Sequence, residues 1–198
     1  MNHTFFSPAK VNLLLKIISR RPDGYHNLFS IVDPISLYDV IKIEEITGDS
    51  IIVEDDAGVL PKGEGNTLFR AAKAVKDCYS VTKGVHISVE KHIPIGSGLG
   101  GPSSNAATVL KALIELWDIH PPETELTRIG AGIGADVPLF LSGKPCIMEG
   151  IGDIITPIEL PFLWYLVVYP DYILSTKEAY SRLKIVLTNS QKHTKLMG

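Results

Sequence analysis

Hydrophobic and polar residues alternate along this chain with two periods, one of two residues and one of about 3.6 residues. Together these periods predict a mixture of strands and helices. The two-residue period is clearest at Val85, Ile87 and Val89, whose neighbours are polar, as in a strand with one buried face. Turn residues at 20–24 end an earlier strand. The strands predicted in this way cover 11–18, 29–37, 39–46, 50–54, 85–90, 146–149 and 163–169.

Helical spacing first occurs at Leu68, Ala71 and Val75 and predicts a helix that runs to about residue 78. Asn66, just before it, is a good N-cap because its side-chain oxygen can accept a backbone N–H of the first turn. Further helices are predicted from about Ser103 to Trp117, from about Glu123 to Ala131 and from near Thr176. This order of elements predicts an α+β domain over 1–160, followed by the start of a second domain over 161–198.

The composition is that of an ordinary globular protein. The 198 residues are 45% hydrophobic and 21% charged, with a formal net charge of −3 and a mean hydropathy of +0.17. These values exclude a disordered or collagen-like chain. The longest apolar stretch, 160–168, is interrupted by Pro161 and falls short of the roughly 20 residues that cross a bilayer, so no membrane span is expected.

The N-terminal segment and the cysteines predict a cytoplasmic protein. The first residues, MNHTFFSP, resemble neither a signal peptide nor a transit peptide. Cys78 and Cys146 stand far apart, without the spacing of a disulfide framework or a zinc site, which suits a reducing compartment. The mild overall acidity disfavours nonspecific binding to nucleic acid.

The first 32 residues carry a local charge of the opposite sign. Lys10, Lys16, Arg20 and Arg21 stand there against Asp23 alone, a local charge of +3. Such a cluster suits an anionic small ligand, and it is equally typical of solvated charges at strand ends. The sequence leaves both interpretations open.

The most distinctive segment is a loop with four glycines in six positions, from Gly96 to Gly101. Its Gly96-x-Gly98-x-x-Gly101 spacing matches the dinucleotide-binding fingerprint, but that motif needs a buried parallel strand before it and an acidic residue about 20 positions later. Here the strand is half polar, and the nearest acids lie in or just after the next helix. A phosphate-binding loop fits better, because glycines let backbone N–H groups approach an anion and a helix N-terminus adds its positive end.

At these residues the chain resembles a known family. The segment Pro94-x-Gly96-x-Gly98-Leu99-Gly100-Gly101-x-Ser103-Ser104-Asn105-Ala106-Ala107 is similar to the ATP loop of the GHMP kinases. Three further segments resemble one branch of that superfamily, the 4-diphosphocytidyl-2-C-methyl-D-erythritol kinases: Ser7-Pro8-Ala9-Lys10-Val11-Asn12-Leu13, Arg21-Pro22-Asp23-Gly24-Tyr25-His26 and Gly134-Ala135-Asp136-Val137-Pro138. The four motifs occur in the family's order over nearly the whole chain.

The resemblance implies the GHMP kinase fold, with an N-terminal lobe of the ribosomal protein S5 domain 2-like type and a C-terminal ferredoxin-like lobe. Family members carry a longer second lobe, so we expect that lobe to be incomplete here. The resemblance also implies transfer of the ATP γ-phosphoryl group to the 2-hydroxyl of the cytidyl substrate, with Mg²⁺, in the non-mevalonate (MEP) pathway to isoprenoids. The corresponding expectation is a cytoplasmic enzyme of small molecules, monomeric or weakly dimeric, without nucleic acid or membrane as partner.

The resemblance assigns the chemistry to Lys10 and Asp136. Asp136 would accept or orient the proton of the substrate hydroxyl, and Lys10 would stabilise charge on the phosphoryl oxygens. The alternatives are that Asp136 caps a turn and that Lys10 is a solvated strand end. The expected ATP contacts are Asn66, Thr67, Leu68, Pro94, Gly96, Ser97, Gly98, Leu99, Gly100, Gly101, Ser103, Ser104 and Asn105, and Ser104 is also the candidate Mg²⁺ ligand.

The expected substrate contacts are Asn12, Tyr25, His26, Thr176 and Tyr180. Tyr25 and Tyr180 would stack on the two faces of cytosine, with His26 at its edge. For Tyr180 ordinary helix packing is the alternative, and for Asn66 an N-cap role alone.

The chain departs from the family pattern at Pro102, where a third glycine is usual. Proline has no N–H, so a phosphate contact at that position is lost, although proline suits the first turn of a helix. Two other functions stay open: another GHMP-type metabolite kinase, for homoserine or mevalonate, and an inactive or weakly active remnant. The Tyr25-His26 pair speaks against the first, whereas Pro102 and the incomplete lobe favour the second.

Overall fold

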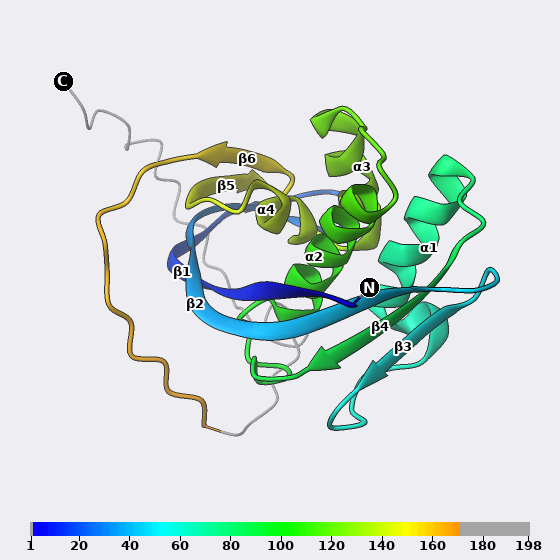
Figure 1. Ribbon diagram of the computed structural model, residues 1–198. Helices are drawn as coiled ribbons and strands as arrows, with labels where there is room; N and C mark the ends of the chain where they lie inside the picture. Colours follow the sequence, from blue (N-terminus) through cyan, green and yellow to red (C-terminus); the bar gives the residue numbers. More distant parts are fainter. Residues whose placement is uncertain (1, 171–198) are drawn as a thin grey trace.

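The computed structural model describes residues 2–170 and shows one six-stranded sheet with helices packed on one face (Figure 1). The sheet has the strand order β3-β4-β2-β5-β6, and β1 pairs with β2. In chain order the elements are β1 (Asn2–Arg20), β2 (His26–Ile46), β3 (Ile51–Asp55), the 3-10 helix η1 (Gly63–Gly65), α1 (Thr67–Tyr79), β4 (Gly84–Glu90), α2 (Gly101–Leu116), α3 (Glu123–Ile133), α4 (Val137–Ser142), β5 (Cys146–Gly150) and β6 (Ile154–Pro157). The α+β class predicted from the sequence is confirmed.

β1 and β2 form one long antiparallel hairpin. Their pairing extends from Asn2 with Glu44 to Arg20 with His26, with three register shifts along the way. The other edge of β2 pairs with β5 over 28–32 and with β4 over 40–46. Because β1 supplies a partner along nearly all of β2, the two strands predicted at 29–37 and 39–46 are one, and the strand predicted at 11–18 already begins at Asn2.

The core lies between the sheet and the helices. Val85, Ile87 and Val89 on β4 are at most 2% exposed, which confirms the predicted alternation. Asn66 caps α1 as predicted, since its Oδ1 accepts the Leu68 N–H at 2.9 Å. Each buried aliphatic side chain of this size contributes about 1.5–3 kcal/mol relative to exposure. This packing fixes the position of the loop that joins β4 to α2.

The elements around that loop differ from expectation in detail. α2 begins at Gly101 rather than at Ser103, and Pro102 lies in its first turn, where a missing N–H costs little. The hydrophobic pattern does not predict α4, which follows Asp136 directly, or β6, which pairs with β5. Both are too short for a period to show.

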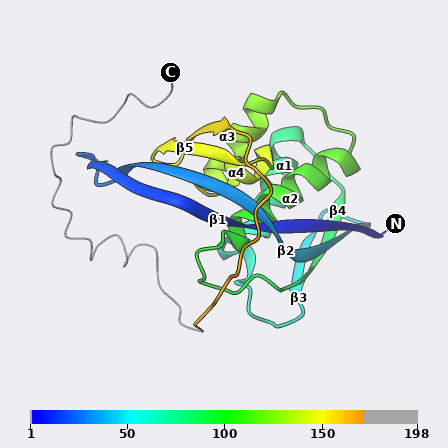
Figure 2. The same cartoon turned by 90° about the vertical axis from the view of Figure 1, so that its left-hand side faces the viewer.

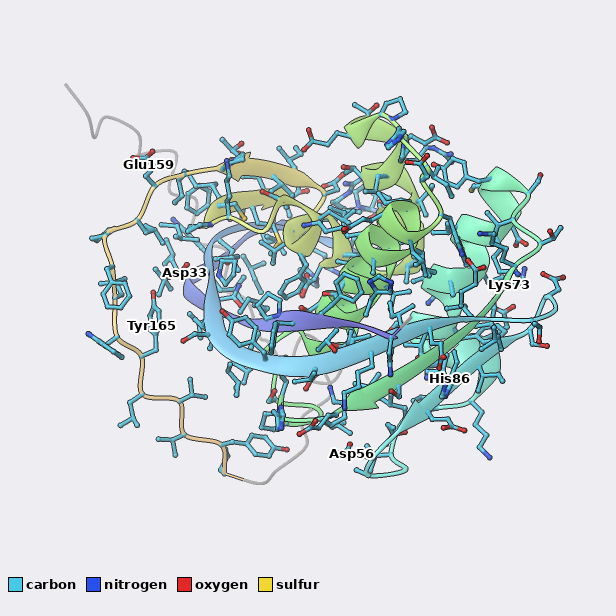
Figure 3. All side chains as sticks on the ribbon, viewed as in Figure 1. Asp33, Asp56, Lys73, His86, Glu159 and Tyr165 are labelled. Atoms are coloured by element: carbon cyan, nitrogen blue, oxygen red, sulfur yellow. The ribbon has the colours of Figure 1, made fainter. Side chains whose placement is uncertain are left out.

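Residues 158–170 contain no strand, so the strand predicted at 163–169 is wrong. A strand needs a neighbour for its hydrogen bonds, and this segment pairs with none among residues 2–170. Tyrosine side chains hold it instead: the Tyr165 hydroxyl donates to Asp33 at 2.7 Å, and the Tyr169 hydroxyl donates to the Ile95 carbonyl at 3.0 Å. Figure 2 shows the segment crossing the β1–β2 hairpin, and Figure 3 labels Tyr165 and Asp33 on the neighbouring segments.

The helix predicted from near Thr176, and with it the expected substrate contacts Thr176 and Tyr180, lies outside the described residues. Over residues 2–170, no helix has the length and apolar character needed to cross a membrane.

Candidate active site

The glycine-rich loop turns the chain from β4 into α2. Gly96, Gly98 and Gly100 have φ angles of +70°, +75° and +78°, a region that residues with a Cβ rarely adopt. The Ser97 hydroxyl donates to the Pro94 carbonyl at 2.7 Å and holds the turn. The turn therefore requires glycine at these three positions, because other residues would adopt this backbone conformation only with strain.

The loop leaves backbone donors free where α2 begins. The Ser104 N–H returns to the Gly100 carbonyl at 2.9 Å, and Pro102 has no N–H to offer. In the part of the chain that the structure describes, no acceptor takes the backbone N–H of Gly100, Gly101 or Ser103. Free N–H groups at the start of a 16-residue helix, together with its dipole, suit a phosphate group.

The loop lies directly against Lys10. The Lys10 N–H donates to the Leu99 carbonyl at 2.9 Å. A Cβ added to Gly100 would lie 3.1 Å from Cγ of Lys10 and 2.7 Å from the Phe140 ring. Gly100 is therefore the place where β1, the loop and α4 meet without room for a side chain.

Lys10 is buried, so the solvated strand end is wrong for this residue. Only 8% of it is exposed, and its Nζ donates to Asn12 Oδ1 at 2.5 Å. Burial lowers the pKa of the Lys10 ammonium, and the negative charge of Asp136 opposes this by raising it. The structure thus brings residues from two separate motifs within electrostatic reach, although no direct ion pair joins these two described side chains.

Asp136 does not cap a helix. It occupies the N-cap position of α4 and is half-buried, yet its side chain makes no capping hydrogen bond, which contradicts the capping alternative. A Cβ added to Gly134 would lie 3.4 Å from Ser103 Oγ, so this turn lies beside the first turn of α2. The Asp136 carboxylate is left available beside the loop and Lys10.

A pocket of about 280 Å³ lies on the other side of the loop. The Thr67 hydroxyl donates to the Pro102 carbonyl at 2.8 Å and joins the start of α1 to that of α2. This volume suits a base or another small planar group rather than a whole nucleotide. The lining is mostly apolar and includes five of the expected ATP contacts besides Pro94: Asn66, Thr67, Leu68, Gly101 and Asn105.

Sequence reasoning missed Lys91 and Asp39 beside this pocket. Lys91 lines it, and its ammonium pairs with the fully buried Asp39 carboxylate. Asp39 also accepts the backbone N–H groups of His92 and Ile93, each at 2.8 Å. Asp39 therefore holds the segment that leads into the loop. A charge at the boundary of two predicted strands resembles a turn residue, so the sequence carried no signal for this role.

Ser104 and Asn105 face the interior. Both are 0% exposed; Ser7 Oγ lies 2.8 Å from Ser104 Oγ and 2.7 Å from Asn105 Oδ1. A buried hydroxyl in such a network does not fit the Mg²⁺ ligand role expected for Ser104. No group of three or more His, Cys, Asp and Glu suited to a metal occurs within residues 2–170.

Tyr25 and His26 lie at the turn of the hairpin. The turn is closed by a hydrogen bond of 2.7 Å from the Arg21 N–H to the Tyr25 carbonyl, and Arg21 pairs with Asp23 at 3.1 Å. Tyr25 is 62% exposed. Lys10 lies ten residues before Arg20, a straight distance of about 33 Å in a strand. The register shifts mark bulges that bend the hairpin (Figure 1), and Figure 2 shows its turn at the outer edge of the described chain, beyond β5.

A larger hollow, of about 730 Å³, lies between 33–38 of β2 and the segment 160–169. Its lining includes Pro94 but neither Lys10, Asp136 nor a loop glycine. The volume of a pocket therefore does not identify the active site. The free backbone N–H groups of the loop and the proximity of Lys10 to Asp136 identify it instead.

Comparison with known proteins agrees with these motifs. Residues 66–144 match the family described as GHMP kinases N terminal domain. A 4-diphosphocytidyl-2-C-methyl-D-erythritol kinase of Clostridioides difficile is 42% identical over 181 residues, which are 90% of this chain and 61% of that protein. The kinase of the same name from Ruthia magnifica is 40% identical over 191 residues, 96% of this chain and 67% of that protein.

Solved structures give the same result. A crystal structure of a 4-(cytidine 5'-diphospho)-2C-methyl-D-erythritol kinase matches with a TM-score of 0.69 and 38% identity over 80% of this chain and 56% of that chain. The homoserine kinase of Cytophaga hutchinsonii matches with a TM-score of 0.61 at 18% identity, over 81% of this chain and 52% of that chain, and so shares the fold.

The chain spans between 61% and 67% of the length of the two curated relatives compared above. Their identity extends well beyond the glycine-rich loop, over nine-tenths of this chain or more. This chain therefore belongs to the 4-diphosphocytidyl-2-C-methyl-D-erythritol kinase family of the GHMP kinases.

Proposed function

We propose that the protein transfers the γ-phosphoryl group of ATP to the 2-hydroxyl of 4-diphosphocytidyl-2-C-methyl-D-erythritol. The observation that carries the proposal is that the buried Lys10 and the half-buried Asp136 lie within electrostatic reach of each other, next to a loop with free backbone N–H groups. Phosphoryl transfer needs an oriented hydroxyl and positive charge around the transferred group, and little covalent chemistry from the protein. These residues supply both requirements.

In this proposal ATP lies across the start of α2. The base enters the pocket lined by Asn66, Thr67 and Leu68, and the phosphates follow the loop to the N–H groups of Gly100, Gly101 and Ser103. Because Gly100 touches Lys10, the γ-phosphate arrives beside the Lys10 ammonium. Mg²⁺ would come with ATP and be held chiefly by its phosphates, and no step below depends on Ser104 as a ligand.

The transfer then uses Asp136 and Lys10 in different roles. Asp136 accepts the proton of the substrate hydroxyl as its oxygen forms a bond to the γ-phosphorus, and the bond from that phosphorus to the bridging oxygen breaks to release ADP. The Lys10 ammonium stabilises the charge on the phosphoryl oxygens. Because Lys10 is buried and its ammonium is held by Asn12, little reorganisation of that charge is needed in the transition state.

Cytosine recognition is proposed for the hairpin turn. The exposed Tyr25 ring offers a stacking face, and His26 follows it directly. Stacking of a base on an aromatic ring contributes about 1–3 kcal/mol. Small-molecule substrates, a cytoplasmic location and a monomer or weak dimer complete the proposal.

The proposal is tested by Asp136→Asn, which keeps the size of the side chain and removes its basicity. We expect kcat to fall by roughly 10²–10⁴, the range for a general base, with KM for both substrates nearly unchanged. The assay couples ADP release to a spectroscopic signal. Asp118→Asn is the matched control, because Asp118 is exposed and has a φ of +52°, which Asn tolerates well.

Asp136→Asn should leave the protein folded and lower the unfolding free energy by about 1 kcal/mol at most, because among the described residues the carboxylate makes no capping bond and no direct ion pair, and only its charge opposite the Lys10 ammonium is lost. Full turnover in Asp136→Asn combined with easier unfolding would return Asp136 to a structural role and remove the basis of the proposal.

A further inference from the structure

The face of the hairpin that carries Lys10 also carries a fixed chain of polar side chains. Lys10 and Asn12 are two residues apart on β1, so they share a face. Asn12 pairs with Val32 of β2, and Ser30 lies two residues along from Val32 on that same face. Ser30 is 0% exposed, and sequence analysis gave it no role.

Each hydrogen bond in this chain has a defined direction. A register shift between Asn12 and Leu14 marks a bulge, and the Ser30 hydroxyl donates to the Leu14 carbonyl at 2.7 Å. A carbonyl can only accept, so the single Ser30 proton is used there. The Ser30 oxygen is left as an acceptor, and it takes the Asn12 Nδ2 proton at 2.7 Å.

The hydrogen bond to Ser30 also fixes which end of the Asn12 amide faces Lys10. With its nitrogen turned toward Ser30, the Asn12 amide must present its oxygen to the Lys10 ammonium, at 2.5 Å. A flipped amide would place an N–H₂ group against the ammonium, donor against donor, and would leave the Ser30 oxygen facing a carbonyl oxygen. One buried hydroxyl thus selects the amide orientation that holds Lys10.

We infer that Ser30 is a positioning residue for Lys10, acting through the Asn12 amide. The inference rests on the proposed kinase function, in which the Lys10 ammonium stabilises the transferred phosphoryl group. The stem of Lys10 is already fixed by Gly100 and by the bond from its backbone to Leu99. The Asn12 oxygen fixes the charged end, which leaves the remaining ammonium protons for Asp136 and the phosphoryl oxygens.

The test compares Ser30→Ala with Ser30→Thr, which keeps the hydroxyl. We expect Ser30→Ala to lower kcat about 10-fold to 100-fold with little change in KM for ATP, the usual effect of misplacing a catalytic group. Ser30→Thr should recover most of this loss. Ser19→Ala is the matched control, because Ser19 accepts the Asn27 Nδ2 proton at 2.9 Å in the same hairpin, nine residues along β1 from Lys10.

A second measurement does not depend on kinase activity. The Lys10 ammonium can be titrated by its ¹³Cε NMR signal in the whole protein, with assignment from Lys10→Arg. Asp136 is the one charged group found to act on Lys10 among the described residues, and it is present in every variant. Loss of the oriented Asn12 oxygen removes stabilisation of the ammonium, so Ser30→Ala should lower the Lys10 pKa further. The alkaline limb of kcat should move to lower pH with it.

Ser19→Ala should leave both the titration and the alkaline limb in place. An unmoved Lys10 titration in Ser30→Ala, or a kcat loss that Ser30→Thr fails to recover while the melting temperature falls, would overturn the inference. A Lys10 titration that moves in a protein without kinase activity would support the link from Ser30 to Lys10 and overturn only the proposed function.

Discussion

The absence of a side chain at Gly100 allows the loop to pack closely against Lys10 and Phe140. Gly100 and Gly98 have nearly the same positive φ, but only Gly100 has neighbours within reach of a Cβ. The glycine-rich motif looks uniform in sequence, yet its positions do different things: Gly98 provides conformation, and Gly100 provides conformation together with room. That distinction depends on what packs against the loop, which the motif itself does not encode.

Alanine at these two positions separates the two contributions. Gly98→Ala should cost only the backbone strain, about 1–2 kcal/mol. Gly100→Ala adds an overlap at 2.7 Å with Phe140 and pushes on Lys10, so we expect about 1–3 kcal/mol of further destabilisation and a kcat at least about 10-fold below that of Gly98→Ala. Urea unfolding and steady-state kinetics measure both. Equal kcat values in the two variants would show that the contact with Lys10 does not matter.

At the residue scale the sequence predicts the types of groups in the site better than their partners. The loop glycines stand out because few residues can replace them, and Lys10 and Asp136 stand out because the motifs around them resemble those of a known family. Ser30 and Asp39 do not, because a serine or aspartate within a strand pattern shows its role only through the side chains it meets across the sheet.

At the scale of elements, the site depends on how β2 holds the end of β4. The Asp39 carboxylate on β2 is 0% exposed and accepts two backbone N–H groups just beyond β4, in addition to its pairing with Lys91. The glycine-rich loop starts at Gly96, three residues after Ile93. The position of that loop is therefore set from the middle of the longest hairpin in the described chain.

Removing this carboxylate should be costly, because Lys91 would then be a buried charge without a partner. We expect Asp39→Ala to lower the unfolding free energy by about 3–5 kcal/mol. Asp77→Ala is the control: it breaks the exposed ion pair with Lys73 at 2.6 Å and should cost no more than about 1 kcal/mol. Chemical denaturation measures the difference. A cost for Asp39→Ala as small as that for Asp77→Ala would mean that Asp39 does not anchor the segment.

Long periodic elements were predictable and short or merged ones were not. α1 and β4 follow because burial on one side imposes a clear period on the sequence. The segments 29–37 and 39–46 form the single strand β2 because β1 pairs with both of them. Such pairing between distant residues is not visible in the local hydrophobic pattern. The segment 163–169 has the pattern of a strand but no partner among the described residues, so pattern alone overstates it.

At the scale of the whole molecule, the proposed reaction requires two distant regions to bind one substrate. The turn with Tyr25 and the Lys10 side chain lie at different points along the same bent hairpin, and Asp136, at the start of α4, acts on Lys10. The distance between the turn and Lys10 would then select a substrate that carries a cytidine at one end and the reacting hydroxyl at the other. Homoserine and mevalonate lack the base, so the turn would contribute nothing to their binding.

The central claim is tested most directly by offering the purified, folded protein ATP with each of three acceptors and following the products by ³¹P NMR. 4-Diphosphocytidyl-2-C-methyl-D-erythritol should gain a new phosphate monoester signal, with kcat/KM at least about 10²-fold above the values for homoserine and mevalonate, since a site built to bind the base gains nothing from acceptors without one. A folded protein that binds ATP but phosphorylates homoserine or mevalonate equally well, or none of the three, would contradict the account.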